Sequence, residues 1–235
     1  MHFSLATRLR LGVALFDDVK RCICGASTLE APLHFMACKH LNAVRIIRHD
    51  RLVQLIARVA RHCGVVTQLE PRIDGEDRSR GDGHLFFHAQ TALFDTIVVD
   101  PCAAIYLKAA QHALGAASAG EHRKSSIYSA RCAQQDIRFY PVALECHGGL
   151  GAHCRDLVSR IAEEGELNGI KLMHGMKSNT FLLRALSFSL QYGNAMLAIH
   201  GSKRSRKETR LIACVSLCVY LCVFDPLSTP VSCLY

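Results

Sequence analysis

Tryptophan is absent from this 235-residue sequence, and aromatic residues make up only 7% of it. Carbohydrate-binding modules and aromatic cages hold their ligands against aromatic rings, so this scarcity argues against both classes. No stretch of 18 uncharged apolar residues occurs, and the sequence therefore predicts no conventional membrane span. The first 16 residues are apolar, but Arg8 and Arg10 break the core that a signal peptide needs.

Acidic residues are outnumbered by basic ones, with 20 Asp and Glu against 28 Lys and Arg, which gives a net charge of +8. This excess indicates an anionic partner, either nucleic acid or an acidic membrane face, and does not choose between them. Half of the residues are hydrophobic and a fifth are charged, so a buried core can form. The length predicts one domain with small appendages.

The sequence contains twelve cysteines but lacks the short length and the secretory signal of a disulfide scaffold. We therefore expect a reducing compartment and one metal site. The closely spaced group is Cys22, Cys24, His34 and Cys38, in which Gly25 allows a tight turn after the first pair. Zinc prefers four such sulfur and nitrogen ligands. The alternative is that these are unligated thiols in a cysteine-rich chain.

Hydrophobic periodicity predicts alternating helices and strands over the middle of the chain. Leu52, Leu55, Ile56, Val59 and Cys63 form one apolar stripe of an arginine-rich helix. The expected elements are a helix over 41–63, a strand over 65–69, a hairpin of strands over 85–87 and 94–99, a helix over 103–135 with a weak point at 115–120, a strand over 138–143 and a helix over 153–164. This order predicts an α/β fold with a small mixed sheet flanked by helices.

The chain is expected to divide into a leader (1–20), a Cys/His segment (21–40), the α/β domain (41–166), a helical extension (167–202) and a basic run with an apolar, cysteine-rich tail (203–235). The run at 203–207 suits nucleic-acid binding or nuclear import, or is a solvated charge cluster. The 14-residue apolar run at 211–224 is short for a membrane helix. A membrane-associated protein that uses residues 203–224 is a further hypothesis.

Carboxylates flank the predicted hairpin. Asp82 lies just before its first strand and Asp95 lies on its second, so the hairpin brings the two together. Such a pair can hold Mg²⁺, which activates water and stabilises the charge of a phosphodiester displacement. Glu70, at the end of the preceding strand, is a candidate third ligand. The alternative is that these acids are simply solvated.

Lys124 and Tyr128 are four residues apart on a predicted helix and therefore share a face. A lysine at this position would stabilise developing negative charge, and a tyrosine would orient a phosphate. The alternative is an ordinary surface pair.

Short motifs also follow one another in a set order. They are Cys22-x-Cys24-Gly25, His34-Phe35-x-x-Cys38, Arg48-His49-Asp50, Glu70-Pro71, Gly81-Asp82, Phe94-Asp95-x-x-Val98-x-x-Pro101, Arg123-Lys124-x-x-x-Tyr128, Phe139-x-Pro141 and Glu145-x-x-Gly148-Gly149-Leu150-Gly151. This series resembles the C-terminal part of the reverse transcriptases of non-LTR retrotransposons that carry a restriction-like endonuclease. The resemblance covers about residues 7–206 and includes a closing helix with Leu190-Gln191-x-Gly193-Asn194.

The resemblance implies a CCHC zinc knuckle followed by a restriction-endonuclease-like domain of the PD-(D/E)xK type. It implies a magnesium-dependent DNA endonuclease that nicks a target so that the 3′ hydroxyl primes reverse transcription. The expected partners are DNA and the element's RNA, with no small-molecule substrate, and the expected location is nuclear, or otherwise cytoplasmic. By position, Asp82 and Asp95 match the metal-binding acids, Lys124 the catalytic lysine and Tyr128 its companion, while Cys22, Cys24, His34 and Cys38 match the knuckle ligands.

The sequence also departs from the family pattern. Gly81 replaces the proline before Asp82, Asp50 stands where asparagine is frequent, and no lysine follows Asp95 two residues later. No Y-x-D-D polymerase motif occurs, so the chain is expected to be a fragment or a decayed copy of a longer element. The alternative function is a catalytically dead, nucleic-acid-binding remnant that keeps the zinc segment and the arginine-rich helix.

Overall fold

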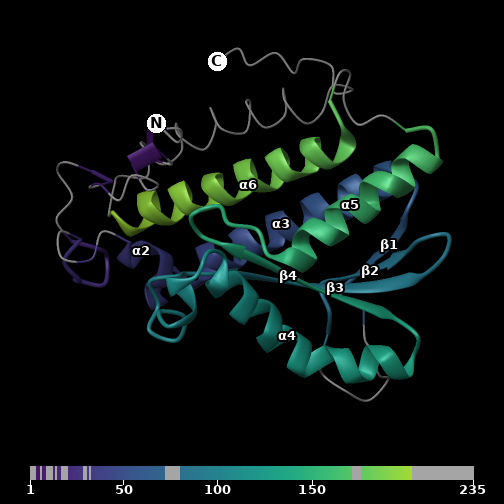
Figure 1. Ribbon diagram of the computed structural model, residues 1–235. Coiled ribbons are helices and arrows are strands. Elements are labelled where there is room, and N and C mark those ends of the chain that lie inside the picture. The colour runs from purple at the N-terminus through teal and green to yellow at the C-terminus, as the bar shows by residue number, and fades with distance from the viewer. Residues whose placement is uncertain are drawn as a thin grey trace, which may run out of the picture. The chain divides into compact units, whose positions relative to one another are not determined.

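The computed structural model of the chain (Figure 1) describes residues 4–5, 7–8, 13, 15–16, 21–28, 31, 33–71, 80–170 and 176–202. It divides into two compact units, residues 42–194 and residues 1–41 together with 195–235. The predictions for the basic run at 203–207 and the apolar run at 211–224 lie outside the described residues. None of the helices in the described part is both long enough and apolar enough to span a membrane.

The larger unit, residues 42–194, is built on a four-stranded mixed sheet with the order β1-β2-β3-β4. The strands are β1 (Val66–Leu69), β2 (Gly83–Phe86), β3 (Thr91–Val99) and β4 (Arg138–Glu145). β1, β2 and β3 pair antiparallel, and β4 pairs parallel to β3. Helix α4 (Gly115–Gln134) makes the crossover that a parallel pair needs. The predicted α/β fold with a small mixed sheet and a central hairpin is confirmed.

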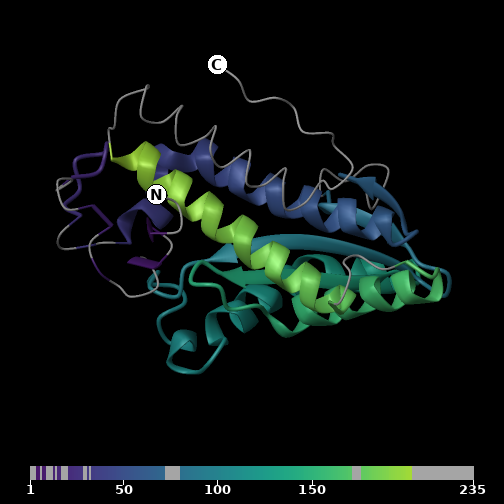
Figure 2. The same cartoon turned by 90° about the horizontal axis from the view of Figure 1, so that it is seen from above.

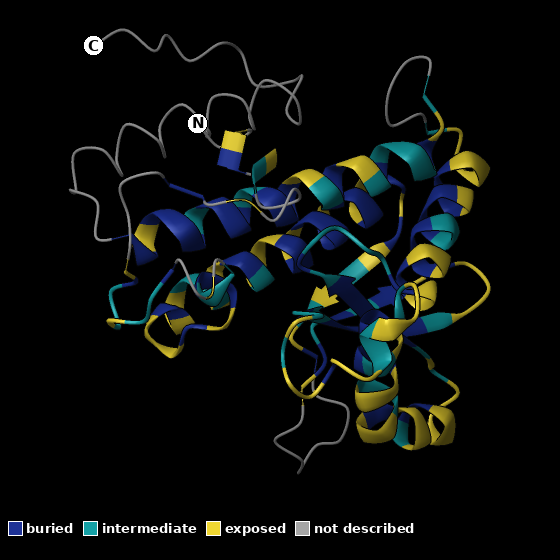
Figure 3. Ribbon diagram, turned by 60° about the vertical axis from the view of Figure 1, so that its left-hand side comes forward, coloured by how far each residue is buried: buried dark blue, intermediate teal, exposed yellow. Residues whose placement is uncertain are grey.

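Helices cover both faces of this sheet (Figure 1). α4 packs on β3 and β4 from one side, whereas α3 (Asn42–His62) and α5 (Ala152–Leu167) pack on the other, where the view from above also shows them (Figure 2). Burial follows these contacts, and the predicted apolar stripe of α3 is buried along its whole length (Figure 3). The arginines of α3 at positions 51, 58 and 61 are exposed.

The expected helix over 103–135 is wrong in its first third. Residues 103–114 form turns and a short 3₁₀ helix, η2 (Ala109–Gln111), and α4 begins only at Gly115. Leu114 has a left-handed φ of 59°, and a Cβ at Gly115 would lie 1.8 Å from the Ala109 carbonyl oxygen. The predicted weak point at 115–120 is instead the first part of the helix. Gly120 brings α4 close to the sheet, because a Cβ there would lie 2.9 Å from Val99.

The predicted helical extension contains α6 (Ser178–Gly201), whose residues up to Asn194 belong to the larger unit. Within the smaller unit, α2 (His34–Ala37) and η1 (Lys39–Leu41) follow a turn at residues 21–27 that closes with a bridge between Arg21 and Ser27. The last turn of α6 packs on this segment, because Ile23 N donates to the Gly201 carbonyl at 2.8 Å. A Cβ at Gly201 would lie 2.2 Å from the Phe35 ring, so only glycine fits there.

Candidate functional site

The first candidate site lies where β2 and β3 separate. The register of this pair ends at Gly83 and Phe94, so Asp82 is the first residue beyond β2. The backbone N–H of Asp82 donates to Phe94 O at 3.1 Å, and its carboxylate Oδ2 accepts from Thr96 N at 2.5 Å. The Asp82 carboxylate therefore accepts the hydrogen bond from Thr96 N that a backbone carbonyl would accept if β2 continued beside β3. Gly81 fits here because a Cβ would lie 2.7 Å from Leu93.

His49 of α3 joins this site from the helical layer. Its Nε2 lies 3.1 Å from Asp82 Oδ2 and 3.2 Å from the Thr96 carbonyl oxygen, and its Nδ1 lies 3.2 Å from Asp50 Oδ1. Burial lowers the pKa of His49, but the hydrogen bond and charge of Asp82, followed by Asp50, outweigh it and raise the pKa to about 9. His49 is therefore protonated at neutral pH. In the sequence, His49 stands out only as part of the Arg48-His49-Asp50 motif, and that motif does not indicate which residue His49 contacts.

Asp95 and Lys124 form the other half of the site. Asp95, on β3, is only 3% exposed, and Lys124 Nζ reaches its Oδ2 from α4. Burial and then the negative charge of Asp82 raise the pKa of Asp95 to about 6, against the lowering effects of Lys124 and His49. The structure thus brings Asp82, Asp95 and Lys124 into one electrostatic group, in which His49 pairs with Asp82 and Lys124 pairs with Asp95.

The backbone of Glu70 lies beside Asp82, because Glu70 N donates to Asp82 O at 3.1 Å, but the Glu70 side chain does not join this group. Glu70 follows β1 with a left-handed φ of 49°, and its side chain is 77% exposed beside Arg80, whose Nη1 lies 3.7 Å from Oε2. In the described part of the chain, the groups of three or more possible metal ligands contain neither Glu70 nor Asp82 nor Asp95. The structure therefore does not support the predicted three-carboxylate magnesium site.

Tyr128 lies one helical turn beyond Lys124 but has a different environment. Its ring is 7% exposed and packs on Leu93 and Phe139, and the ring centroids of Tyr128 and Phe139 are 5.2 Å apart. Its hydroxyl donates to the Arg80 carbonyl at 3.1 Å. Tyr128 thus holds the chain two residues before Asp82, which makes it a positioning residue for the carboxylate in this structure.

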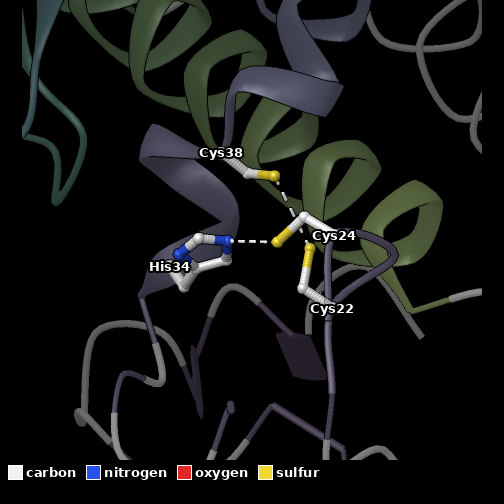
Figure 4. A group of neighbouring side chains, drawn as sticks. All are labelled: Cys22, Cys24, His34 and Cys38. Carbon is white, nitrogen blue, oxygen red and sulfur yellow. Dashed lines mark hydrogen bonds between the residues drawn. The ribbon is translucent and has the colours of Figure 1, made fainter. Parts of the chain in front are cut away.

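The second candidate site is the Cys/His cluster of the smaller unit (Figure 4). The possible ligand atoms of Cys22, Cys24, His34 and Cys38 all lie within 4.8 Å of one another. Cys22 Sγ is 3.7 Å from Cys38 Sγ, and Cys24 Sγ is 3.0 Å from His34 Nε2. A turn in which Gly25 has a φ of 91° brings the first two thiols together. The other two ligands lie at the two ends of α2, which begins at His34 and is followed by Cys38.

The electrostatics of the cluster suit a metal ion. A backbone hydrogen bond from Ala26, together with His34 and against the effect of burial, lowers the pKa of the Cys24 thiol to about 6. Burial raises the pKa of Cys22 to about 11, so this thiol keeps its proton until a cation draws it off. The cluster thus offers one thiol that ionises easily, two further thiols and an imidazole. These four groups could bind a metal such as zinc, which takes such ligands in tetrahedral geometry.

No protein-family model matches the chain, and no curated protein sequence matches it.

Proposed function

We propose that residues 42–194 form a restriction-like endonuclease domain of retroelement origin, which nicks DNA with the help of Mg²⁺ to prime reverse transcription. The observation that carries the proposal is that Asp82 and Asp95 lie next to the last paired residues of β2 and β3, close enough for the charge of Asp82 to act on Asp95, with Lys124 in contact with Asp95. Two acids and a lysine in one electrostatic group at the interior strand β3 suit metal-assisted phosphodiester hydrolysis.

In this proposal, Asp82 and Asp95 hold the metal, which when bound supplies an activated water. Lys124 stabilises the negative charge that develops on the phosphate, and Tyr128, if it leaves the Arg80 carbonyl, orients the substrate. In the state described, His49 and Lys124 neutralise the two carboxylates. Metal binding must therefore displace at least one of these two cations. Deprotonation of His49 favours metal binding, because neutral His49 no longer competes with the metal for the Asp82 carboxylate.

The Cys/His cluster supports the accompanying proposal of a zinc knuckle that binds DNA or the element's RNA. The exposed arginines of α3 at 51, 58 and 61 supply a basic helix face for the same anionic partner. A DNA target implies a nuclear location for the working protein.

The experiment is a nicking assay on supercoiled plasmid with and without Mg²⁺, using the whole chain. We expect Asp82→Asn and Asp95→Asn to reduce the nicking rate by about 10²-fold or more, because each removes a carboxylate from the proposed metal site. Asp156→Asn is the matched control, since this carboxylate pairs with Arg138 on the surface, 2.7 Å away. Equal rates in the wild type and both site variants would exclude the endonuclease.

The second candidate is a catalytically dead, nucleic-acid-binding remnant. It is favoured by the closed ion pairs of Asp82 and Asp95, and because, among the described residues, no group of three possible metal ligands within 4.8 Å of one another contains either acid. Binding of an oligonucleotide that weakens steeply with salt, together with no cleavage at any Mg²⁺ concentration, would select this function.

A further inference from the structure

A group of possible metal ligands lies at the end of the parallel strand pair, away from the ion pairs of Asp82 and Asp95. β3 and β4 end in register at Val99 and Glu145, and Cys146 N extends the ladder by donating to Val99 O at 2.8 Å. The two chain segments that leave the sheet here carry Asp100 and Cys102 on one side and His147 on the other. The strand pairing itself therefore holds the three residues together.

The ligand atoms of Asp100, Cys102 and His147 lie within 4.8 Å of one another. Tetrahedral zinc with ligand distances of about 2.0–2.3 Å requires ligands about 3.3–3.8 Å apart, so the group must close by about 1.5 Å at most. The turn after β3 is already formed, because Asp100 Oδ1 accepts from Cys102 N at 3.0 Å and Asp100 O accepts from Ala103 N at 2.9 Å.

Buried polar residues lie next to these possible ligands. Cys146, 1% exposed, directs its Sγ to Asp100 Oδ1 at 3.7 Å, and its carbonyl accepts from Asn194 Nδ2 at 2.7 Å. The guanidinium of Arg48, 6% exposed, interacts electrostatically with Asp100 and Cys146. Such partners orient a ligating side chain in the way that the outer shell of a metal site does.

We propose that Asp100, Cys102 and His147 form a second zinc site, distinct from the Cys/His cluster and independent of the proposed endonuclease. One thiolate, one imidazole and one carboxylate are a ligand set that zinc accepts, and their charges of −1, 0 and −1 balance the ion. Cys102 is exposed and the other two residues are half-buried, so one side of the site faces solvent. The fourth position is therefore open to water or to an anionic ligand, unlike the closed set at Cys22, Cys24, His34 and Cys38.

The test is the zinc content of the whole chain, purified after zinc loading and removal of free metal, for the wild type and matched histidine variants. His147→Ala is expected to lose one zinc per chain relative to the wild type. His122→Ala, which changes an exposed histidine outside both clusters, is expected to lose none. Because His147 lies on a surface turn, circular dichroism and the unfolding midpoint of metal-free His147→Ala should match those of the metal-free control.

Two further variants keep the proposal open to refutation if His147→Ala is unstable. Asp100→Asn retains the acceptor for Cys102 N and so preserves the turn, and Cys102→Ser replaces an exposed thiol. Each is expected to lose the same single zinc, and in the cobalt-substituted protein Cys102→Ser is expected to weaken the thiolate-to-cobalt absorption. The Cys24→Ser variant separates the two sites, because it should leave this zinc in place. Unchanged zinc content in Asp100→Asn and Cys102→Ser would overturn the proposal, whatever the outcome for the Cys/His cluster.

Discussion

His49 Nε2 lies 3.1 Å from Asp82 Oδ2, which ties helix α3 to the residue that precedes β2. The same carboxylate oxygen accepts from Thr96 N, so helix α3 and strand β3 are both joined to this one atom. In the proposed endonuclease this carboxylate also holds the metal. The Asp82 carboxylate therefore contributes both to the stability of the fold and to the proposed metal site. Protonation of His49 strengthens the ion pair with Asp82 and opposes metal binding by the same carboxylate.

The stability of the chain should depend on pH through His49. Its pKa is raised from 6.5 to about 9 by Asp82 and Asp50, against the effect of burial, so the folded state binds this proton more tightly than the unfolded state. The contribution is fully present below pH 6.5 and is lost as the pH rises through 9. Allowing for solvent screening at this half-buried side chain, we expect a loss of about 1–2 kcal/mol in the free energy of unfolding.

Urea unfolding of the wild type and His49→Gln at pH 6 and pH 9.5 measures this loss, since other titrations cancel in the difference between the two proteins. His122→Gln, at an exposed histidine, is the control and should follow the wild type. The same dependence on pH in the wild type and His49→Gln would remove the role assigned to His49.

Periodicity predicted the fold because the elements are strongly patterned. The apolar stripe of α3 and the apolar run within β4 specify burial directly, and the structure places them as expected. The start of α4 could not be found in this way. It depends on a left-handed Leu114 and on the contact of Gly115 with Ala109, which are tertiary features that residue type does not encode.

The candidate site was predictable in part, and for a different reason. Hairpin geometry alone brings Asp82 near Asp95, but periodicity places Lys124 no closer to them than any other helical lysine; its match came from the ordered motifs. Glu70 was expected nearby because it ends a strand, yet its left-handed backbone turns the side chain to solvent. His49 was missed as a site residue because its partner is 33 positions away in the sequence.

Removal of the Lys124 charge should destabilise the protein, because Asp95 is 3% exposed and would remain beside Asp82 without its cation. Breaking a buried pair in this way costs about 3–5 kcal/mol, and we expect Lys124→Met to lie at the lower end, since Asp95 can take up a proton instead. Urea unfolding at pH 8 measures the cost. Lys108→Met, at an exposed lysine, should be neutral.

A double substitution separates this charge effect from the loss of the lysine side chain. Asp95→Asn with Lys124→Met leaves no unpaired charge, so it should recover most of the stability lost in Lys124→Met. If the double variant is as unstable as the sum of the two single variants, the ion pair contributes nothing and the packing of Lys124 is responsible.

Metal removal should unfold the Cys/His segment. A structural zinc site supplies the folding free energy of so short a segment, so a chelator is expected to collapse the amide NMR signals of residues 21–41. His34→Ala should have the same effect without a chelator and should lose one zinc per chain. His40→Ala is the control, because His40 is exposed in the same unit and outside the cluster. Unchanged signals after complete removal of zinc would show that the four residues are not a folding site.

Asn194 should be more important to stability than its side chain size suggests. It is fully buried, its Oδ1 accepts from Arg48 Nη1 at 2.7 Å, and its Nδ2 donates to the Cys146 carbonyl at 2.7 Å. Asn194→Leu keeps the volume but takes one acceptor from a buried guanidinium and the shorter of two hydrogen bonds from the Cys146 carbonyl, to which Gln191 Nε2 also donates at 3.4 Å. Each such loss costs about 1–3 kcal/mol, so we expect a decrease of about 2–4 kcal/mol in the free energy of unfolding. Gln54→Leu, an equivalent amide-to-alkyl change on the exposed face of α3, should change it by less than about 0.5 kcal/mol, and a similar small value for Asn194→Leu would mean that these hydrogen bonds do not stabilise the fold.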